Sequence, residues 1–418
     1  MSHRNLLTSL KTLIRRLGKL SFRKDTYICY LPLAHVLELV CEFGGLLNGI
    51  KLAYSSPQTI TDNSTAVKKG QKGDLRVLKP TIMAAVPVVL ERLSKTLHEK
   101  LAQTNWFKQT LFQCAYKKKL DYYRAGRSTR VLDRILFKRI SSAVLGGKMR
   151  VLLSGGAILS KEVQEFAQVC FCPVMQAYGL TETCGGGTTM LPNQTQPGIC
   201  GSVIGCCEIR LVDWPEAGYH VTDKPNPRGE IYIGGDCITQ GYYNLPDKTK
   251  EDYRVINGVR YFSTGDIGEM TATGNLKIID RKKDLVKLQG GEYVSLNKLE
   301  NAIKLLPFAD NCCVVADSFK INCVVIICPN VKKISEYVQQ LEEEENRNKN
   351  GDENGSSSTS SSSGKEVDVF KELEQNKKLK ERLQKELTEI CLKQGCQCDS
   401  QLTQALVAGS CAAVLRAC

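Results

Sequence analysis

The residues best suited to chemistry include an adjacent hydroxyl and carboxylate. In the run YGLTETCGGGT, Thr181 and Glu182 follow a predicted strand at residues 174–178. The carboxyl ends of strands in α/β sheets are common ligand sites, where a carboxylate can hold Mg²⁺ against phosphate oxygens and a hydroxyl can donate to them. A Thr-Glu pair alone is common, so its meaning depends on the rest of the chain.

A second candidate acid lies in the run YFSTGDIGEM. The sequence predicts that Asp266 is exposed in a turn bracketed by Gly265 and Gly268. A carboxylate presented in this way suits vicinal hydroxyls such as those of a ribose. A solvated hairpin turn is the alternative.

Charged residues and a glycine pair follow the second acid. An apolar run at residues 276–279 leads into DRKKD, which holds Arg281 and Lys283, and the next strand ends at Gly290 and Gly291. Charges between two strands, followed by paired glycines, predict a ligand-facing hinge. An ordinary basic run is the alternative.

Taken together, these motifs point to one family. TGD followed by DRKKDLVK and GGEYVSL resembles the adenylate-forming acyl-CoA synthetase superfamily, and the long-chain fatty acid ligases in particular. YGLTET, LPLAHVLE and SGGAILS match the same family, although the last has Ile158 where the family usually has Pro. KGDLRVLKPTIMAAVP is most similar to the subgroup that handles polyunsaturated chains. The resemblance covers roughly residues 1–330.

The resemblance implies a role for each matching residue. The residues implied to bind nucleotide are Gly155, Gly156 and Ala157 in an adenine-facing loop, Tyr178 and Gly179 along the adenine, Thr181 on the phosphate, Glu182 on the metal, and Asp266 and Arg281 on the ribose. His35 would help to shape the fatty-acid site. Lys283 would be the hinge, and Gly290 and Gly291 would lie beside the pantetheine channel.

The implied reaction consumes ATP with Mg²⁺ and uses coenzyme A as a substrate. A long-chain fatty carboxylate attacks the α-phosphorus, pyrophosphate leaves, and the thiol of coenzyme A then displaces AMP from the acyl-adenylate. The protein's task is to align anions that repel each other and to neutralise the developing charge.

Composition limits the class of partner. The net charge of +13 favours anionic partners such as nucleotides or an acidic membrane surface, without requiring nucleic acid. No apolar run reaches the roughly 20 residues that span a bilayer, so any membrane association must be peripheral or be carried by sequence that this chain lacks. By the resemblance, we expect the cytosolic face of the endoplasmic reticulum or another intracellular membrane, such as the mitochondrial outer membrane or the peroxisome. A basic amphipathic segment at residues 6–20 could lie on a membrane, but an ordinary covering helix is favoured.

Cysteine usage indicates a reducing compartment. The chain has 19 cysteines, an odd number without the spacing of a disulfide framework. Adjacent pairs such as Cys206 with Cys207 are not expected to face one metal ion easily, and Cys391, Cys396 and Cys398 have no second pair at finger spacing. We therefore expect no metal cluster.

Strand-then-helix alternation at residues 27–49 and 75–97 predicts an α/β fold with a parallel sheet. We expect an incomplete α/β AMP-binding domain at residues 1–196 and a β-barrel subdomain at 197–282. A small α+β domain should occupy residues 283–393, with a disordered polar insertion at 342–365. Residues 394–418 depart from the family pattern.

Two expected elements are missing from the printed sequence. The family's glycine-rich phosphate loop would precede residue 1, and its terminal lysine is not matched after residue 393. We therefore expect weak or absent catalysis from this chain. The competing hypotheses are another adenylating enzyme (an aryl-CoA ligase or a peptide-synthetase adenylation domain), a non-catalytic nucleotide- or lipid-binding fragment, and a structural or membrane-coating protein.

Overall fold

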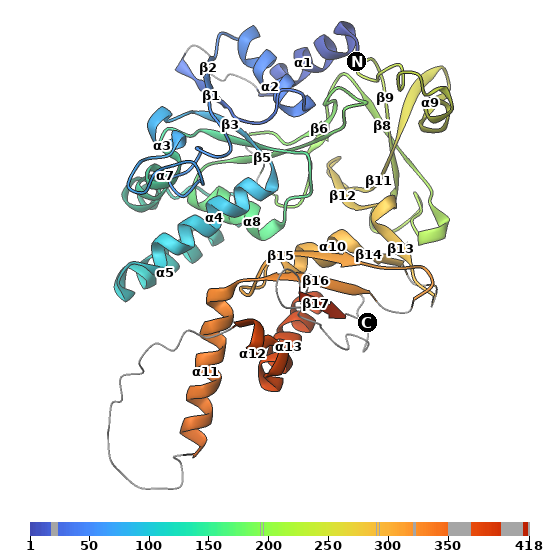
Figure 1. Cartoon of the computed structure of the whole chain (residues 1–418). Helices are drawn as coiled ribbons and strands as arrows, with labels where there is room; N and C mark the ends of the chain where they lie inside the picture. Colours follow the sequence, from blue (N-terminus) through green and yellow to red (C-terminus); the bar gives the residue numbers. More distant parts are fainter. Residues whose placement is uncertain are drawn as a thin grey trace. The chain divides into compact units, whose positions relative to one another are not determined.

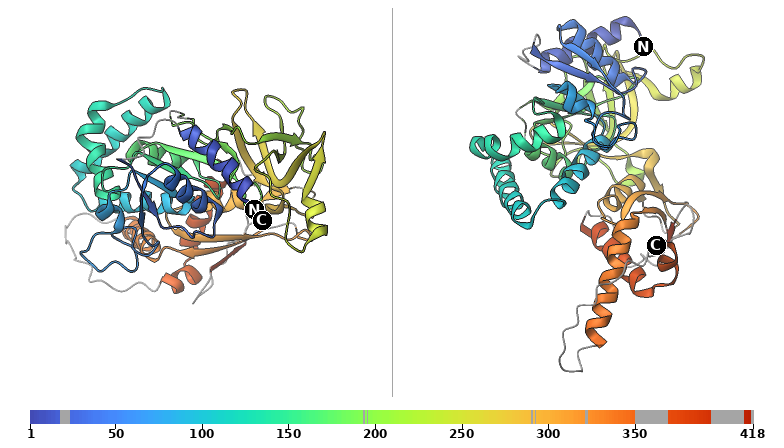
Figure 2. Two further views of the ribbon diagram at one scale, coloured as in Figure 1. Left: turned by 90° about the horizontal axis from the view of Figure 1, so that it is seen from above. Right: turned by 60° about the vertical axis from the view of Figure 1, so that its left-hand side comes forward.

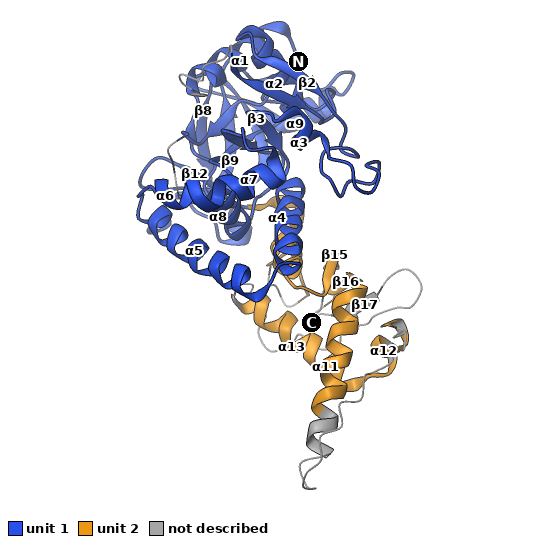
Figure 3. Cartoon of the chain, turned by 90° about the vertical axis from the view of Figure 1, so that its left-hand side faces the viewer, with its two compact units in different colours: residues 1–279 blue, residues 280–418 orange. Residues whose placement is uncertain are grey.

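A computed structural model describes residues 1–17, 24–192, 194, 196–289, 291, 293–320, 323–349, 369–393 and 413–416. The chain forms two compact units, Met1–Ile279 and Asp280–Cys418 (Figure 3). The boundary lies within strand β12 (Leu276–Arg281), slightly before the expected domain start at residue 283.

The main sheet of unit 1 has seven strands in the order β2-β1-β3-β4-β5-β6-β7 (Figure 1). Pairing is parallel from β2 to β5 and antiparallel between β5, β6 and β7. The strands are β1 (Thr26–Cys29), β2 (Lys51–Tyr54), β3 (Ile82–Ala85), β4 (Val151–Ser154), β5 (Val174–Gly179), β6 (Gly187–Thr189) and β7 (Ser202–Val203). The expected α/β fold with parallel pairing is confirmed, and β6 and β7 add an antiparallel edge.

Helices cover both faces of this sheet, as Figures 1 and 2 show. Buried residues alternate along the strands, so Met83 packs with α4, α5, α7 and α8, whereas Ile82 and Ala84 pack with α2. The helices are α1 (His3–Leu17), α2 (Val36–Leu47), α3 (Asp74–Leu78), α4 (Pro87–Ala102), α5 (Trp106–Arg124), α6 (Arg130–Leu132), the π-helical turn η2 (Asp133–Phe137), α7 (Lys138–Leu145) and α8 (Lys161–Cys170).

Helix α1 is held by the rest of unit 1. Leu10 is buried against Val36 and Val40 of α2. The side-chain amide of Asn5 donates to the backbone carbonyls of Asp236 and Ile238, at 2.9 Å each. The favoured interpretation of residues 6–20 as a covering helix fits these contacts. Among the helices that the structure describes, none is long and apolar enough to cross a bilayer.

A second, antiparallel sheet follows in unit 1, in the order β10-β11-β9-β8, with β12 paired to β11. Its elements are β8 (Glu208–Val212), η3 (Pro215–Ala217), β9 (Arg228–Gly234), α9 (Pro246–Asp252), β10 (Tyr253–Ile256), β11 (Val259–Met270) and β12. In the described part of the chain, no pairing joins β8 to β10 or to β12. The β-barrel subdomain stays a prediction.

Unit 2 is a small α+β unit. The antiparallel pair β13 (Leu285–Lys287) and β14 (Tyr293–Ser295) accompanies a sheet in the order β15-β16-β17. Its remaining elements are η4 (Lys282–Asp284), α10 (Leu296–Ile303), β15 (Ala309–Val315), β16 (Val324–Pro329), α11 (Val331–Lys349), α12 (Val369–Gln375), α13 (Lys377–Lys393) and β17 (Ala413–Arg416). Leu299, Phe308 and Leu379 lie in one buried core.

Two expected boundaries differ from these elements. Helix α11 continues to Lys349, so the first residues of the predicted insertion are helical, which fits the good helix formers Glu, Arg and Lys there. The rest of the insertion, residues 350–365, lies outside the described residues. Within the expected divergent tail, β17 pairs with β16.

Candidate functional site

The centre of the candidate site is a hydrogen bond between the two sheets of unit 1. Tyr178, near the end of β5, donates from its hydroxyl to Oδ2 of Asp266 in β11, at 2.8 Å. Burial of Tyr178 and the neighbouring Asp266 carboxylate raise the pKa of the tyrosine. The phenol therefore stays neutral and remains a donor to the carboxylate.

Asp266 is not the exposed turn residue that the sequence predicted. It lies inside β11 and is only 6% exposed. The pairing of β11 with β9 shifts register between Ser263 and Ile267, and Gly265 within that bulge has φ +70°. A bulge re-aims a side chain without ending the strand, so the glycine-bracketed motif turns Asp266 inward.

Thr181 and Glu182 lie in the glycine-rich turn between β5 and β6. Thr181 is exposed and Glu182 is half-buried. The hydroxyl of Tyr242 donates to Oε1 of Glu182 at 2.8 Å, and the backbone N–H of Thr239 donates to the Glu182 carbonyl at 2.8 Å. These contacts hold the carboxylate in place.

The surroundings of Glu182 fit a divalent cation. Among the residues that the structure describes, no lysine or arginine forms an ion pair with Glu182, and Oε2 makes no hydrogen bond. A half-buried carboxylate with one oriented oxygen and one open oxygen is a hard ligand of the kind that Mg²⁺ prefers. Glu182 could therefore hold Mg²⁺, with Tyr242 orienting it.

Sequence reasoning missed two supporting residues. The buried hydroxyl of Thr183 accepts from the backbone N–H of Leu180 at 3.0 Å and lies 2.5 Å from the Gly186 carbonyl oxygen, which ties the turn together. A threonine two positions after Thr181 in YGLTET was the available signal. Tyr242 had no local signal, because it lies 60 positions from Glu182.

The predicted adenine-facing loop lies beside β5. A Cβ atom added to Gly155 would be 3.2 Å from the Ala177 carbonyl oxygen and 3.9 Å from Cδ1 of Leu37. The absence of a side chain thus lets the loop approach both β5 and α2. Gly156 and Ala157 follow and are exposed. This arrangement leaves the edge of the loop open to a flat ligand.

Two further glycines shape the turn after β5. A Cβ atom added to Gly179 would lie 2.7 Å from the backbone of Gly185, and one added to Gly185 would lie 3.5 Å from Cγ2 of Val40. The turn therefore packs tightly on itself and on α2. Helix α2 touches both glycine-containing loops of the candidate site.

His35 begins α2 and acts as its N-cap. Its Nδ1 accepts from the backbone N–H of Leu37 at 3.2 Å, and its side chain is exposed. His35 is two residues before Leu37, whose side chain lies beside Gly155. The observed contact of His35 is a helix cap, and any contact with substrate remains a prediction.

The remaining predicted residues lie in unit 2. Arg281 ends β12 and Lys283 lies in η4, and both are exposed. Asp280 beside them is buried, and it accepts from the Arg281 backbone N–H at 2.8 Å and from the Ser295 hydroxyl at 2.9 Å. Burial raises the pKa of this carboxyl. Asp280 therefore anchors the segment, a role that the DRKKD pattern did not predict.

The glycine pair predicted beside the pantetheine channel is described only in part. Gly291 is exposed with φ +88°, and its N–H donates to the Leu288 carbonyl at 2.9 Å. Gly290 lies outside the described residues. The backbone at Gly291 is thus a tight turn of a kind that favours glycine.

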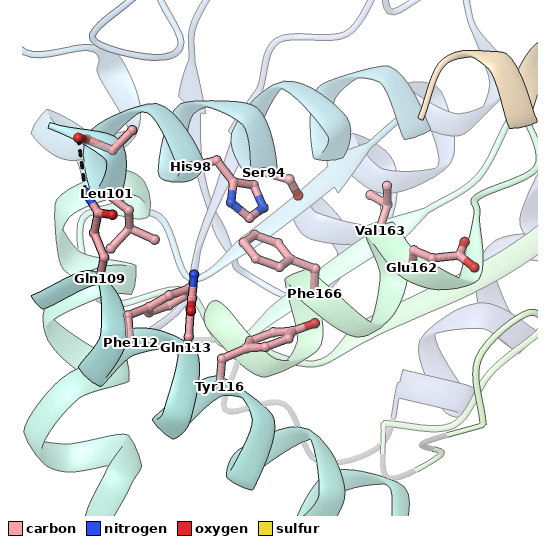
Figure 4. Close-up of a pocket in the computed structure, with 11 residues that line it drawn as sticks. Ser94, His98, Leu101, Gln109, Phe112, Gln113, Tyr116, Glu162, Val163 and Phe166 are labelled. Carbon is pink, nitrogen blue, oxygen red and sulfur yellow. Dashed lines mark hydrogen bonds between the residues drawn. The ribbon is translucent and has the colours of Figure 1, made fainter. Parts of the chain in front are cut away.

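A cavity of about 550 Å³ lies between α4, α5 and α8 (Figure 4). His98 stacks on Phe166 with ring centroids 4.6 Å apart, and Tyr116 is 5.6 Å from the same ring. Glu162 and Val163 line its other end, at the start of the helix that follows the 155–157 loop. None of the described predicted site residues lines this cavity.

The structure corrects one expectation about metals. The sulfur atoms of Cys206, Cys207 and Cys237 all lie within 4.8 Å of one another. Adjacent cysteines were not expected to face one metal ion easily, because successive side chains point to opposite faces of a strand. Cys206 lies in a turn instead, where successive side chains do not alternate in this way. Cys29, Glu38 and Glu42 form a second close group on the α2 face.

Comparisons with known proteins give a consistent result. Residues 1–243 match the family model described as AMP-binding enzyme. The chain is 43% identical over 348 residues to long chain acyl-CoA synthetase 8 of Arabidopsis thaliana, covering 81% of this chain and 48% of the relative. It is 36% identical over 342 residues to long-chain-fatty-acid-CoA ligase 1 of Saccharomyces cerevisiae, covering 82% and 47%. The chain thus spans about half the length of these curated relatives.

Solved structures share the fold. The A domain of a carboxylic acid reductase from Segniliparus rugosus, in complex with AMP and a co-purified carboxylic acid, has a TM-score of 0.62 at 22% identity, covering 95% of this chain and 52% of that one. An o-succinylbenzoate CoA synthetase from Bacillus subtilis, in complex with its acyl-adenylate intermediate, has a TM-score of 0.52 at 21% identity, covering 76% and 53%. Identities this low support the fold alone.

Proposed function

Because the chain belongs to the AMP-binding enzyme family, we propose that it contributes to the ATP-dependent activation of long-chain fatty acids to acyl-CoA through an acyl-adenylate. The observation that carries the proposal is the Tyr178–Asp266 hydrogen bond beside the turn that holds Glu182. The names of the curated relatives support long-chain fatty acids as the substrate class.

The site residues have distinct proposed tasks. Asp266 accepts from the ribose hydroxyls, and Tyr178 keeps that carboxylate in place while its ring lies along the adenine. Gly155 to Ala157 provide a flat edge for the base. Thr181 donates to the α-phosphate. These tasks are positional, so the protein supplies orientation rather than a nucleophile.

Charge on the phosphates needs a counterion. Mg²⁺ bound at Glu182 would neutralise charge on the phosphate oxygens. Tyr242 fixes the rotamer of Glu182, so the open carboxylate oxygen points in one direction. In unit 2, we propose that Arg281 contacts the ribose and that Lys283 marks the hinge, where rotation would admit coenzyme A beside Gly290 and Gly291.

We also propose where the acyl chain binds. The cavity of about 550 Å³ begins at Glu162 and Val163, a few residues after the adenine-facing loop, and continues along α4 past Ser94 to Ala102. Its lining includes Leu101, Phe112 and Phe166, which suit a hydrocarbon chain. We propose that His35, the N-cap of α2, borders the carboxylate end.

A binding experiment tests the substrate class. Non-hydrolysable acyl-sulfamoyl adenosines carrying a hexadecanoyl, benzoyl or aminoacyl group would be titrated into the full chain by calorimetry. We expect the hexadecanoyl compound to bind tightest. Tighter binding of the benzoyl or aminoacyl compound would favour another adenylating enzyme. No binding of any compound would overturn the proposed nucleotide site.

Turnover is a separate measurement. Fatty-acid-dependent pyrophosphate release with ATP, Mg²⁺ and oleate or arachidonate, with and without coenzyme A, would show whether the chain catalyses the first step. Release well above background would show that the residues of this chain suffice for that step. Binding without turnover would favour the non-catalytic alternative for this chain.

We propose peripheral contact with an anionic intracellular membrane, such as the cytosolic face of the endoplasmic reticulum. Trp106 is 76% exposed at the start of α5, next to the exposed Phe107 and Lys108. Exposed aromatic side chains beside a cation suit a membrane interface. A Trp106→Ser, Phe107→Ser variant should lose co-sedimentation with phosphatidylserine vesicles, whereas Tyr243→Ser, at another exposed aromatic residue, should not.

A further inference from the structure

The three-cysteine cluster comes from two separate loops of unit 1. Cys206 and Cys207 lie between β7 and β8, and Cys237 follows β9. Cys206 and Cys237 are buried and Cys207 is half-buried, and all three are free thiols. Their sulfur atoms lie within 4.8 Å of one another. The tertiary fold thus collects three soft ligands at one point.

This spacing suits a metal ion. With Zn–S bonds of about 2.3 Å in tetrahedral geometry, ligand sulfurs lie about 3.8 Å apart, so the cluster needs only small rotations to reach that distance. No histidine or carboxylate belongs to this close group among the described residues. A set of thiols alone selects soft cations over Mg²⁺ or Ca²⁺.

We propose that Cys206, Cys207 and Cys237 form a three-thiolate site for a thiophilic d¹⁰ cation, Zn²⁺ or Cu⁺. Each thiol releases its proton when it binds the ion, so loading releases up to three protons and transfers no electrons. The Gly187 carbonyl oxygen lies 3.3 Å from the Cys207 sulfur and also accepts from the backbone N–H of Ile204 at 3.0 Å. This site is separate from the hard-ion site proposed at Glu182.

The cluster supports the glycine-rich turn of the candidate nucleotide site. A Cβ atom added to Gly186 would lie 2.8 Å from the Cys237 sulfur, so that sulfur packs directly against the turn. The Cys207 thiol donates to the carbonyl of Gly187, the residue after Gly186. An ion bound here would connect the loops after β7 and β9 behind the segment that carries Thr181 and Glu182.

The first test needs no substitution. The reduced full chain would be titrated separately with Zn²⁺ and with Cu⁺ under anaerobic conditions, then analysed by native mass spectrometry. We expect one tightly bound ion, proton release on loading, and a higher melting temperature. Alkylation mapping should show that loading protects these three cysteines, while Cys114 and Cys313, which are exposed, stay reactive.

Substitutions then locate the site. Cys206→Ser and Cys237→Ser should each weaken metal binding at least about tenfold, within the range typical for loss of metal-site contacts. Cys170→Ser is the matched control, because Cys170 is also buried and lies in α8, outside the cluster. Co²⁺ absorption would report thiolate coordination in any variant that folds.

Three outcomes would overturn the proposal. One is that neither cation protects the three cysteines in the wild-type chain. The other is that Cys206→Ser and Cys237→Ser bind metal as tightly as Cys170→Ser does. The third is that mild oxidation of the reduced chain forms a disulfide between Cys237 and Cys206 or Cys207, and that added metal does not prevent it. That result would identify a redox pair instead.

Discussion

The Tyr178 hydroxyl lies 2.8 Å from Oδ2 of Asp266, and this hydrogen bond joins strand β5 of one sheet to β11 of the other. The two residues are 88 positions apart. The bond positions a carboxylate at the end of the main sheet, next to the turn that carries Thr181 and Glu182. The contact therefore links the proposed ribose, adenine and phosphate contacts.

Asp266→Asn should weaken AMP binding about 10- to 100-fold, because hydrogen bonds to a charged group are worth about 1.5–3 kcal/mol. Calorimetry with AMP and with 2′,3′-dideoxy AMP would test this. The wild-type chain should prefer AMP, and the variant should lose that preference. Glu269→Gln removes another carboxylate of β11, which forms an ion pair with Lys277. This control variant should keep the preference for AMP. An equal loss in both variants would contradict the ribose assignment.

Glu182→Gln should abolish the strengthening of ATP binding by Mg²⁺, because an amide oxygen carries no charge. Tyr242→Phe removes the hydroxyl that orients Glu182 and should lower the apparent Mg²⁺ affinity about tenfold. The measurement is ATP affinity across a Mg²⁺ series. If Glu182→Gln responds to Mg²⁺ as the wild type does, the metal assignment is wrong.

Gly187→Ala should destabilise unit 1 by about 1–3 kcal/mol and weaken nucleotide binding, since overpacking has costs of this size. An added Cβ atom would lie 2.2 Å from the Tyr178 carbonyl oxygen. Gly205→Ala is the control, because its nearest neighbour would be 3.8 Å away. Urea unfolding followed by tryptophan fluorescence reports unit 1, which contains Trp106 and Trp214. Equal stability of the two variants would contradict this packing.

Glu38 should make the stability of unit 1 depend on pH. Burial raises its pKa from 4.5 to about 7, although a hydrogen bond donated by Tyr27 at 2.6 Å lowers it. The folded chain therefore keeps a proton that the unfolded chain releases above pH 4.5. The stabilisation is complete below that pH and is lost as the pH rises through about 7.

Glu38→Gln should remove this dependence. Relative to the variant, the wild-type chain should lose about 3 kcal/mol of unfolding free energy between pH 4.5 and pH 8. Urea midpoints at a series of pH values would measure the difference. Tyr27→Phe should move the loss to higher pH, because the hydrogen bond that lowers the pKa of Glu38 is absent. If the urea midpoints of the wild type and Glu38→Gln change with pH in the same way, Glu38 is not the source of the pH dependence.

The sequence by itself determined the family and the order of the elements. Strand-then-helix alternation and motifs such as YGLTET depend only on residues close in sequence, so they can be recognised without the structure. They predicted the turn that carries Thr181 and Glu182, and the glycine loop at Gly155. Charge runs likewise marked the segment around Lys283 that begins unit 2.

Only the tertiary structure decided which distant side chains meet. A register shift buries Asp266 against Tyr178, and loop packing brings Tyr242 to Glu182 and Cys237 to Cys206. Local patterns carry no information on these pairs, because each depends on strand pairing or packing between segments far apart in the sequence. Burial then changed the chemistry of the groups, since a carboxylate that a turn would expose is held and oriented inside the fold.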